Sequence, residues 1–278
     1  MTASPGPIRT YRDFIAGRTA AQAARDVARD LALRALALGR SPTSTSGWIR
    51  FPYYHHVFDD ERRDFARQLD FMSGLGDFIG LDAAVALLDS GGPIDGRYFC
   101  PTFDDGFKNW IENAVPILMD KKARATFFVV TRYVGASVDR DRELLKGFYS
   151  AGGRLMEFLD WDDCRKMVAA GFAVGSHTVN HVHLAELDDA GVEAELRRSK
   201  DRIETETGRP CHHFCCPFGR EGVDYLPMRD PPIAKRVGYR SFLTGERGAM
   251  RRGSSAMLIR RDHLLAGWGN HQLRYFFS

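Results

Sequence analysis

Residues 98–106 read YFCPTFDDG, a short apolar run that ends in two adjacent aspartates and a glycine. Such a run, bounded by turn residues, is typical of a buried β-strand. The carboxylates of Asp104 and Asp105 repel each other at the strand end, and a cation that neutralises one of them lowers this repulsion. The motif alone predicts two structures equally: a cation site, or a turn that leads into a helix N-cap.

Seven short apolar runs predict strands. They cover residues 48–54, 98–103, 125–131, 172–176, 213–216, 239–243 and 256–259. Helical patterns lie between most of them, at residues 60–73, 82–89, 110–121, 161–170 and 189–207. Short strands that alternate with helices indicate a mostly parallel sheet. This number of strands predicts an α/β barrel, closed or partly open, and a flat doubly wound sheet is the alternative.

Reactive side chains collect directly after four of the predicted strands. In chain order they are His55 and His56, Asp104 and Asp105, His177, and the turn 217–219. The carboxyl ends of the strands in a parallel barrel form one face, and active sites lie on that face. We therefore expect residues that are far apart in the sequence to meet there.

His177 and His181 lie four residues apart. On a helical turn this spacing places both imidazoles on one side, within reach of a single ion. A pair of histidines on a helix surface is the alternative. Together with a strand-end aspartate, the pair supplies two imidazoles and one carboxylate, and coordination positions stay open for water, as in catalytic zinc sites.

The cysteines Cys211, Cys215 and Cys216 are predicted to be structural. Their segment reads as a buried strand, and the sequence has no second cysteine pair at zinc-finger spacing that would complete four ligands. Five cysteines without framework spacing indicate reduced thiols and predict a cytoplasmic location.

Composition excludes several functional classes. The chain has 278 residues, of which 44% are hydrophobic and 27% charged, an ordinary globular balance. A formal net charge of +3 without a basic arm argues against nucleic-acid binding. No apolar stretch approaches the ~20 residues of a membrane-spanning helix.

The N-terminal region is predicted to be separate from the rest of the chain. Residues 1–47 comprise a tail, an amphipathic helix within residues 11–38 and a linker, whereas residues 48–278 form the main domain. We expect the helix to pack against that domain. A helix that lies on an anionic membrane surface is the alternative.

Three motifs together resemble those of the polysaccharide deacetylases with a NodB homology domain, carbohydrate esterase family 4. TFDDG (102–106) is similar to the family's first motif and HTVNH (177–181) to its second, and CCPFG (215–219) stands where the family has Arg-x-Pro-Tyr-Gly. The resemblance extends over about residues 53–259. It implies a distorted, incomplete (β/α) barrel of about seven parallel strands, here with an extra N-terminal helix.

The resemblance also implies a role for each matched residue. Asp104 would be the general base, and a divalent metal, most often Zn²⁺ with Co²⁺ or Mn²⁺ as alternatives, would be held by Asp105, His177 and His181. Substrate and oxyanion would be bound by Pro217 and the backbone N–H of Phe218. The general acid would be His263, with His55 or His56 as substitutes.

The implied activity is removal of an N-acetyl group from an amino sugar of a polysaccharide or glycoconjugate, with release of acetate. The alternatives are a deacylase of a small N-acyl compound or a lipid-linked sugar, and a non-catalytic carbohydrate-binding relative. The chain departs from the family at Cys215, which replaces the motif arginine that orients the base, and no fourth motif is visible in SFLTGERG (241–248). We expect Arg220 or Arg260 to supply the missing cation.

Overall fold

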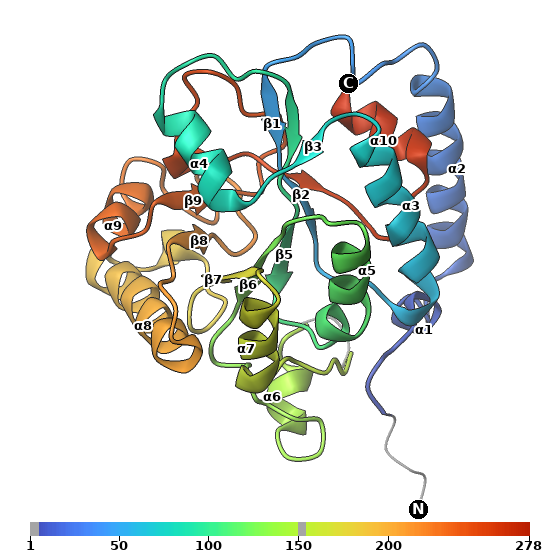
Figure 1. The fold of residues 1–278 in the computed structure, drawn as a ribbon. Coiled ribbons are helices and arrows are strands. Elements are labelled where there is room, and N and C mark those ends of the chain that lie inside the picture. The colour runs from blue at the N-terminus through green and yellow to red at the C-terminus, as the bar shows by residue number, and fades with distance from the viewer. Residues whose placement is uncertain (1–5, 150–153) are drawn as a thin grey trace, which may run out of the picture.

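A computed structural model describes residues 6–149 and 154–278 and has a seven-stranded parallel sheet at its centre (Figure 1). The strand order is β10-β2-β5-β6-β7-β8-β9, and all neighbouring pairs are parallel. The strands are β2 (Pro52–Tyr54), β5 (Thr102–Asp105), β6 (Thr126–Val129), β7 (Ala173–Ser176), β8 (His213–Cys215), β9 (Ser241–Leu243) and β10 (Asp262–His263).

One short segment connects the two edges of this sheet. Ile259 forms a parallel bridge with Leu243 of β9, and the N–H of Asp262 in β10 donates to the carbonyl of Phe51 (2.9 Å). The sheet therefore curls into a distorted, incomplete barrel that this segment closes only in part. The predicted barrel is confirmed, and the flat doubly wound alternative is wrong.

A second, smaller sheet arises where two predicted strands are divided. It has the order β1-β4-β3 and consists of β1 (Trp48–Arg50), β4 (Arg97–Phe99) and β3 (Asp77–Phe78). The predicted strands 48–54 and 98–103 each contribute to both sheets. Pro52 and Pro101 lie at the breaks, and a proline cannot donate to a strand ladder.

The last predicted strand, 256–259, is wrong. Its residues form a 3₁₀-helix over Ala256–Leu258, and only the isolated bridge of Ile259 is strand-like. The strand that completes the sheet here is β10, which begins three residues after Ile259. This change of register decides which side chains of the segment face the barrel interior.

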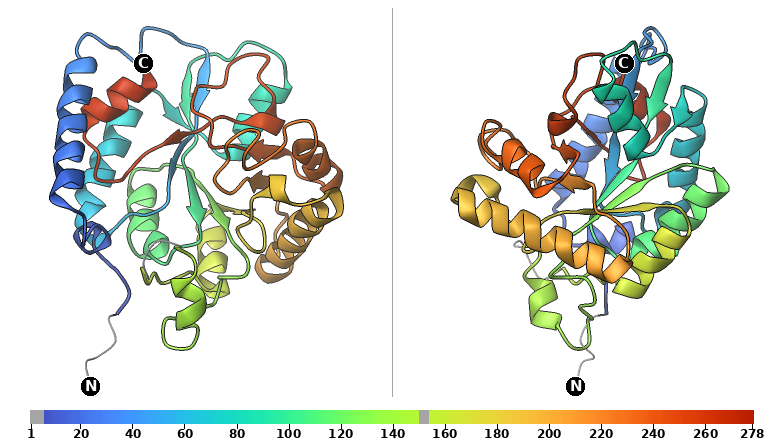
Figure 2. Two further views of the ribbon diagram at one scale, coloured as in Figure 1. Left: turned by 180° about the vertical axis from the view of Figure 1, so that it is seen from behind. Right: turned by 60° about the vertical axis from the view of Figure 1, so that its left-hand side comes forward.

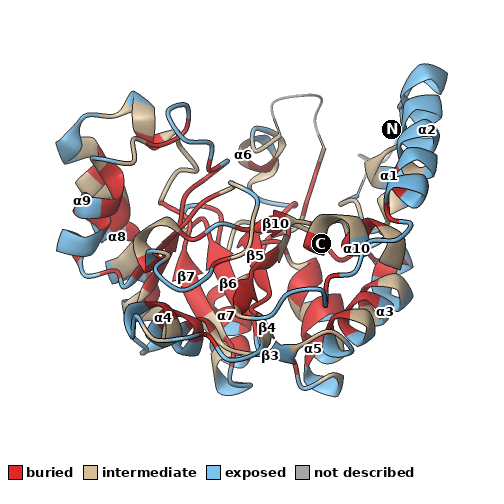
Figure 3. Cartoon of the chain, turned by 90° about the horizontal axis from the view of Figure 1, so that it is seen from above, coloured by how far each residue is buried: buried red, intermediate tan, exposed pale blue. Residues whose placement is uncertain are grey.

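Helices surround the main sheet (Figures 1 and 2). Those at predicted positions are α3 (Arg62–Ser73), α4 (Leu81–Asp89), α5 (Val115–Asp120), α7 (Trp161–Ala169) and α8 (Asp189–Thr207). Three helices were not predicted: α6 (Arg142–Lys146), α9 (Asp230–Val237) and α10 (Asn270–Phe277). Side chains cap the N-termini of α7, where Asp160 and Asp163 form a capping box, and of α8, where Asp188 accepts from the N–H of Gly191. Figure 3 shows the strands buried between helices whose outer sides are exposed.

The helical pattern predicted from residue 11 to residue 38 is interrupted, because the region contains two helices. α1 (Tyr11–Phe14) is separated from α2 (Ala20–Leu36) by a turn in which Gly17 has a φ of 86°. Thr19 then caps α2 and forms a capping box with Gln22. α2 packs on α10, and the division of the chain at residue 47 stays a prediction. Among the described residues, no helix combines the length and apolar character needed to cross a membrane.

Candidate active site and metal centre

The end of β5 carries both aspartates into the interior of the barrel. Asp104 is 2% exposed and Asp105 4% exposed. Asp105 has a φ of 93° and Gly106 follows with 104°, so the chain turns sharply as soon as the strand ends. The predicted strand with two terminal carboxylates is confirmed, and the helical segment that follows the turn begins at Trp110 with Asn109, not an aspartate, as its N-cap.

The structure brings Asp105, His177 and His181 together. Oδ1 of Asp105 lies 3.5 Å from Nε2 of His177 and 3.3 Å from Nε2 of His181. The two histidines reach the carboxylate from the loop after β7, not from a helical turn as predicted. Potential ligand atoms of all three residues lie within 4.8 Å of one another, which makes them a candidate metal centre.

These three residues fit a divalent cation. Oδ1 of Asp105 is buried and has no hydrogen-bond partner among the described residues, an arrangement that is unfavourable unless a cation occupies the space between the three side chains. Nδ1 of His177 donates to the carbonyl of Cys215 (2.8 Å), so its Nε2 is the nitrogen left to bind a metal. An Asp-His-His set is a common donor group for Zn²⁺ and similar ions.

Backbone strain is concentrated around this candidate metal centre. Four of the five non-glycine residues with positive φ in the described chain lie here, namely Asp105 (93°), Thr178 (67°), His181 (58°) and Phe218 (59°). Each such conformation costs about 1–3 kcal/mol and persists only where surrounding contacts enforce it. One such contact is the bond from the His181 N–H to Oγ1 of Thr178 (2.9 Å).

Asp104 has a different partner, Arg261. Nη1 and Nη2 of Arg261 donate to Oδ1 and Oδ2 of Asp104 at 2.8 and 2.7 Å, and the thiol of Cys215 lies 3.6 Å from both oxygens. Burial by itself would raise the pKa of Asp104, but Arg261, together with His177 and His55, more than offsets this and holds that pKa below its ordinary value. Asp104 is therefore an ionised carboxylate in a fixed orientation.

The two arginines expected to provide this cation do not. Arg220 pairs with Asp224 through its Nε at 2.9 Å, and Arg260 is exposed. Arg261 was missed although it is the neighbour of Arg260. Because successive residues of an extended segment point to opposite sides, the register of the closing segment turns Arg261 inward and Arg260 outward.

Cys215 lies where the family motif has arginine, and it does not form a second metal site. Its Sγ, a carboxylate oxygen of Asp104 and a ring nitrogen of His177 lie within 4.8 Å of one another. However, both oxygens of Asp104 are bonded to Arg261, and Nδ1 of His177 is bonded to a carbonyl. Burial raises the pKa of the Cys215 thiol well above its ordinary value, as expected for the structural cysteine that the sequence predicts.

Pro217 and Phe218 border the candidate metal centre on the β8 side. The Phe218 ring is 48% exposed and stacks on His183, with centroids 4.1 Å apart, and it also contacts His181. In the described part of the chain, the backbone N–H of Phe218 has no acceptor. It is therefore a donor that a ligand could use.

His263 and His55 face each other across the site. Nε2 of His263 lies 3.2 Å from Nδ1 of His55, so one ring donates to the other. Burial, with smaller effects from His55 and Arg247, lowers the pKa of His263 to about 3. His56 is bonded to Tyr149 and Asn109: its Nε2 lies 2.7 Å from the hydroxyl of Tyr149 and its Nδ1 3.2 Å from Nδ2 of Asn109.

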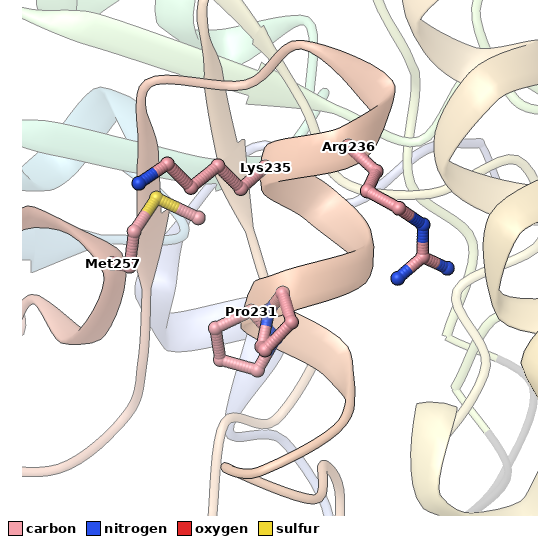
Figure 4. A pocket seen from close by; sticks show the side chains of 5 residues that line it. Pro231, Lys235, Arg236 and Met257 are labelled. Carbon is pink, nitrogen blue, oxygen red and sulfur yellow. The ribbon is translucent and has the colours of Figure 1, made fainter.

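A cavity of about 620 Å³ joins these groups. Polar residues of the site line one part of it: His55, Asp104, Asp105, His177, His181, Arg261 and His263. Aromatic side chains line it as well: Tyr11 and Phe14 of α1, Phe58, Tyr133, Phe148 and Tyr149. A separate hollow beside α9 contains neither a carboxylate nor an imidazole; there Lys235 lies next to Met257 while Arg236 projects from the other side of the helix (Figure 4).

Comparison with known proteins identifies the family. A family model described as polysaccharide deacetylase matches residues 92–241, more than half of the chain. The chain belongs to the polysaccharide deacetylase family. The match includes Asp104, Asp105, His177 and His181 but ends before Arg261 and His263.

Individual relatives of this polysaccharide deacetylase family member are distant. YxkH of Bacillus subtilis (strain 168) is 24% identical over 166 residues, which are 60% of this chain and 51% of the relative, so the chain spans about half the length of the curated relative that it matches. The deacetylase PplD of Streptococcus pyogenes, solved in complex with acetate, is 21% identical with a TM-score of 0.66 and covers 84% of this chain and 100% of its own. IcaB from Ammonifex degensii is 22% identical with a TM-score of 0.68 and covers 84% and 97%. These two likenesses show a shared fold.

Proposed function

We propose that this family member is a metal-dependent hydrolase of carbon–nitrogen bonds other than peptide bonds, which removes an N-acetyl group from an amino sugar and releases acetate. One observation carries the proposal: an ionised carboxylate, Asp104, adjoins the metal-binding group of Asp105, His177 and His181 in one cavity. A binding module has no use for a fixed base beside a metal, which argues against a non-catalytic carbohydrate-binding relative.

Asp105, His177 and His181 would hold the metal. A bound divalent ion such as Zn²⁺ lowers the pKa of water toward ~7 and polarises a carbonyl oxygen. Asp104 would accept a proton from the attacking water, because it is ionised and is not one of the three ligands. Arg261 would keep its two oxygens oriented during this transfer.

Other residues of the site would stabilise the oxyanion and protonate the leaving amine. The free N–H of Phe218 would donate to the oxyanion of the tetrahedral intermediate, with Pro217 shaping the turn that presents it. His263 would protonate the departing amine. Its imidazole is neutral in the free protein, and negative charge on the intermediate would favour protonation of the His55–His263 pair.

The aromatic part of the cavity favours a particular kind of substrate. Tyr11, Phe14, Phe148 and Tyr149 contribute to the lining beside the reactive groups. Such a surface would accommodate an apolar group next to the N-acetyl sugar. A lipid-linked sugar or a small N-acyl compound is therefore a second candidate substrate alongside a polysaccharide.

The test is release of acetate by purified, zinc-loaded protein from N-acetylglucosamine oligomers, N-acetylated lipid-linked sugars and nucleotide sugars. Asp104→Asn is the matched variant, since it keeps the shape of the side chain but removes the base. We expect the variant to retain metal and to lose about 10²–10⁴-fold in turnover. Failure of the wild-type protein to release acetate from any of these substrates would contradict the proposal.

A further inference from the structure

The helix α2 turns its polar face toward the body of the protein. Oδ1 of Asp30 accepts hydrogen bonds from Nε2 of His271 (2.7 Å) and Nε2 of Gln272 (3.0 Å), both in α10. The guanidinium of Arg29 lies over the ring of Trp268, 5.9 Å from its centroid. Leu33 is the one buried residue within α2. Charged side chains therefore make much of the contact that a surface helix ordinarily makes with apolar ones.

The opposite face of α2 is apolar and points into solvent. Val27, Leu31 and Leu38, the last just beyond the helix, are 61%, 60% and 79% exposed. Their spacing of four and seven residues aligns them on one side of a helix, which they share with the exposed alanines Ala24, Ala28 and Ala35 and with the exposed Arg34. Figure 3 shows α2 at the edge of the molecule, exposed along most of its length.

This stripe is unusual for the chain as a whole. Among the residues that the structure describes, eight large hydrophobic side chains are exposed, and four of them (Val27, Leu31, Leu36 and Leu38) belong to α2 or the residues that follow it. A contiguous exposed apolar stripe of this kind marks an interaction surface.

The charge of the region indicates the partner. Residues 1–47 contain seven arginines and three aspartates and no lysine or glutamate, a formal net charge of +4. The whole chain has +3, so residues 48–278 together have −1. The net positive charge is thus confined to the segment that carries the apolar stripe, and Arg25 and Arg34 of α2 are both exposed.

We propose that α2 docks on an anionic lipid bilayer, lying in the plane of the headgroups with Val27, Leu31 and Leu38 inserted between them. A helix that combines an apolar face with arginines binds such surfaces through buried apolar area and attraction to anionic lipids. A second copy of the chain is the less favourable partner, because the +4 segment would then meet the same charge. This surface is independent of the catalytic proposal.

The experiment is flotation of the full chain with vesicles of phosphatidylcholine mixed with phosphatidylglycerol, and with vesicles of phosphatidylcholine alone. We expect flotation with the anionic vesicles, weakened by added salt, and little with the neutral ones. Val27→Gln/Leu31→Gln/Leu38→Gln should lower the partition coefficient at least about tenfold. Arg25→Gln alone should lower it about fivefold, as expected for one basic residue near a charged surface.

The matched control is Met119→Gln/Met228→Gln, which changes two exposed apolar residues outside the N-terminal region. It should float like the wild-type protein, and thermal unfolding checks that each variant is folded. Absence of flotation with anionic vesicles, or equal flotation of the triple variant and the wild type, would overturn the proposal. So would a wild-type dimer in sedimentation that the triple variant converts to a monomer, since the stripe would then be covered by a second copy.

Discussion

The two neighbouring aspartates at the end of β5 have opposite surroundings. Both oxygens of Asp104 are bonded to Arg261, whereas Oδ1 of Asp105 has no hydrogen-bond partner in the described chain and lies between two imidazoles. Although burial alone would raise both pKa values, Arg261 lowers that of Asp104, and His177 with His181 lowers that of Asp105. One carboxylate is thus paired within the protein and the other is arranged for a cation from solution.

Substitution of a residue proposed to hold the metal should have the largest effect on metal content and on acetate release. In Asp105→Ala or His181→Ala, one of three ligands is removed, and the metal content measured by elemental analysis should fall to background. Because a bound metal provides several kcal/mol of transition-state stabilisation, acetate release should fall by roughly a thousandfold or more. His183→Ala is the matched control, since this nearby histidine bonds Asp224 and is outside the group. Unchanged metal occupancy in His181→Ala would remove His181 from the ligand set.

Substitution of Arg261 tests the surroundings of Asp104, the other aspartate of this comparison. Arg261→Met leaves Asp104 as an unpaired buried carboxylate, so the free energy of unfolding should fall by about 3–5 kcal/mol. Metal content should stay unchanged, while kcat falls about a hundredfold and KM changes little, because only the base is misplaced. Arg260→Met is the control for loss of an arginine from the same segment.

A second substitution distinguishes positioning from mere stability. Cys215→Arg, added to Arg261→Met, places a guanidinium at the position of the family motif, next to the same carboxylate. We expect it to recover a large part of kcat. A double variant that regains stability but not kcat would show that Arg261 is only a structural partner of Asp104.

The sequence predicted the surroundings of Asp105 better than those of Asp104. Asp105, His177 and His181 belong to short motifs directly after predicted strands, and parallel topology alone brings strand ends together. Arg261 contacts Asp104 across 157 residues of sequence, and its orientation depends on the register of a two-residue strand. An error of one residue, from Arg261 to Arg260, exchanges the inside and outside of that segment.

The fold shows the same contrast. The central strands have strong apolar signals and were predicted within a few residues. The divided strands at Pro52 and Pro101, the helix α10 and the inward polar face of α2 depend on contacts between distant segments, which local pattern does not record.

His263 and His55 allow a smaller test of the proton donor. His263→Ala should lower kcat by about tenfold to hundredfold with little change in KM, since protonation of the leaving amine occurs after binding. His55→Ala is the companion variant, because the two rings share one hydrogen bond. A large loss in His55→Ala with none in His263→Ala would reassign the general acid to His55.

Glu61 is a third buried carboxylate of the cavity. Among the described residues it pairs with no cation and accepts only from the N–H groups of Phe58 (3.2 Å) and Gly267 (2.9 Å). Burial therefore dominates and raises the pKa of Glu61 to about 7. Between its ordinary pKa of 4.5 and 7 the folded protein binds more protons at Glu61 than the unfolded chain, so stability falls as the pH rises through this window.

This contribution can be measured by chemical denaturation from pH 5 to 8. Up to about 3 kcal/mol of stability should be lost over the window through Glu61, and Glu61→Gln should flatten that slope whatever its absolute stability. Glu186→Gln, at an exposed position, should keep the wild-type slope. An unchanged slope in Glu61→Gln would mean that its backbone hydrogen bonds stabilise the charged form as effectively as Arg261 stabilises Asp104, and that a buried carboxylate in this barrel does not need a cation to stay ionised.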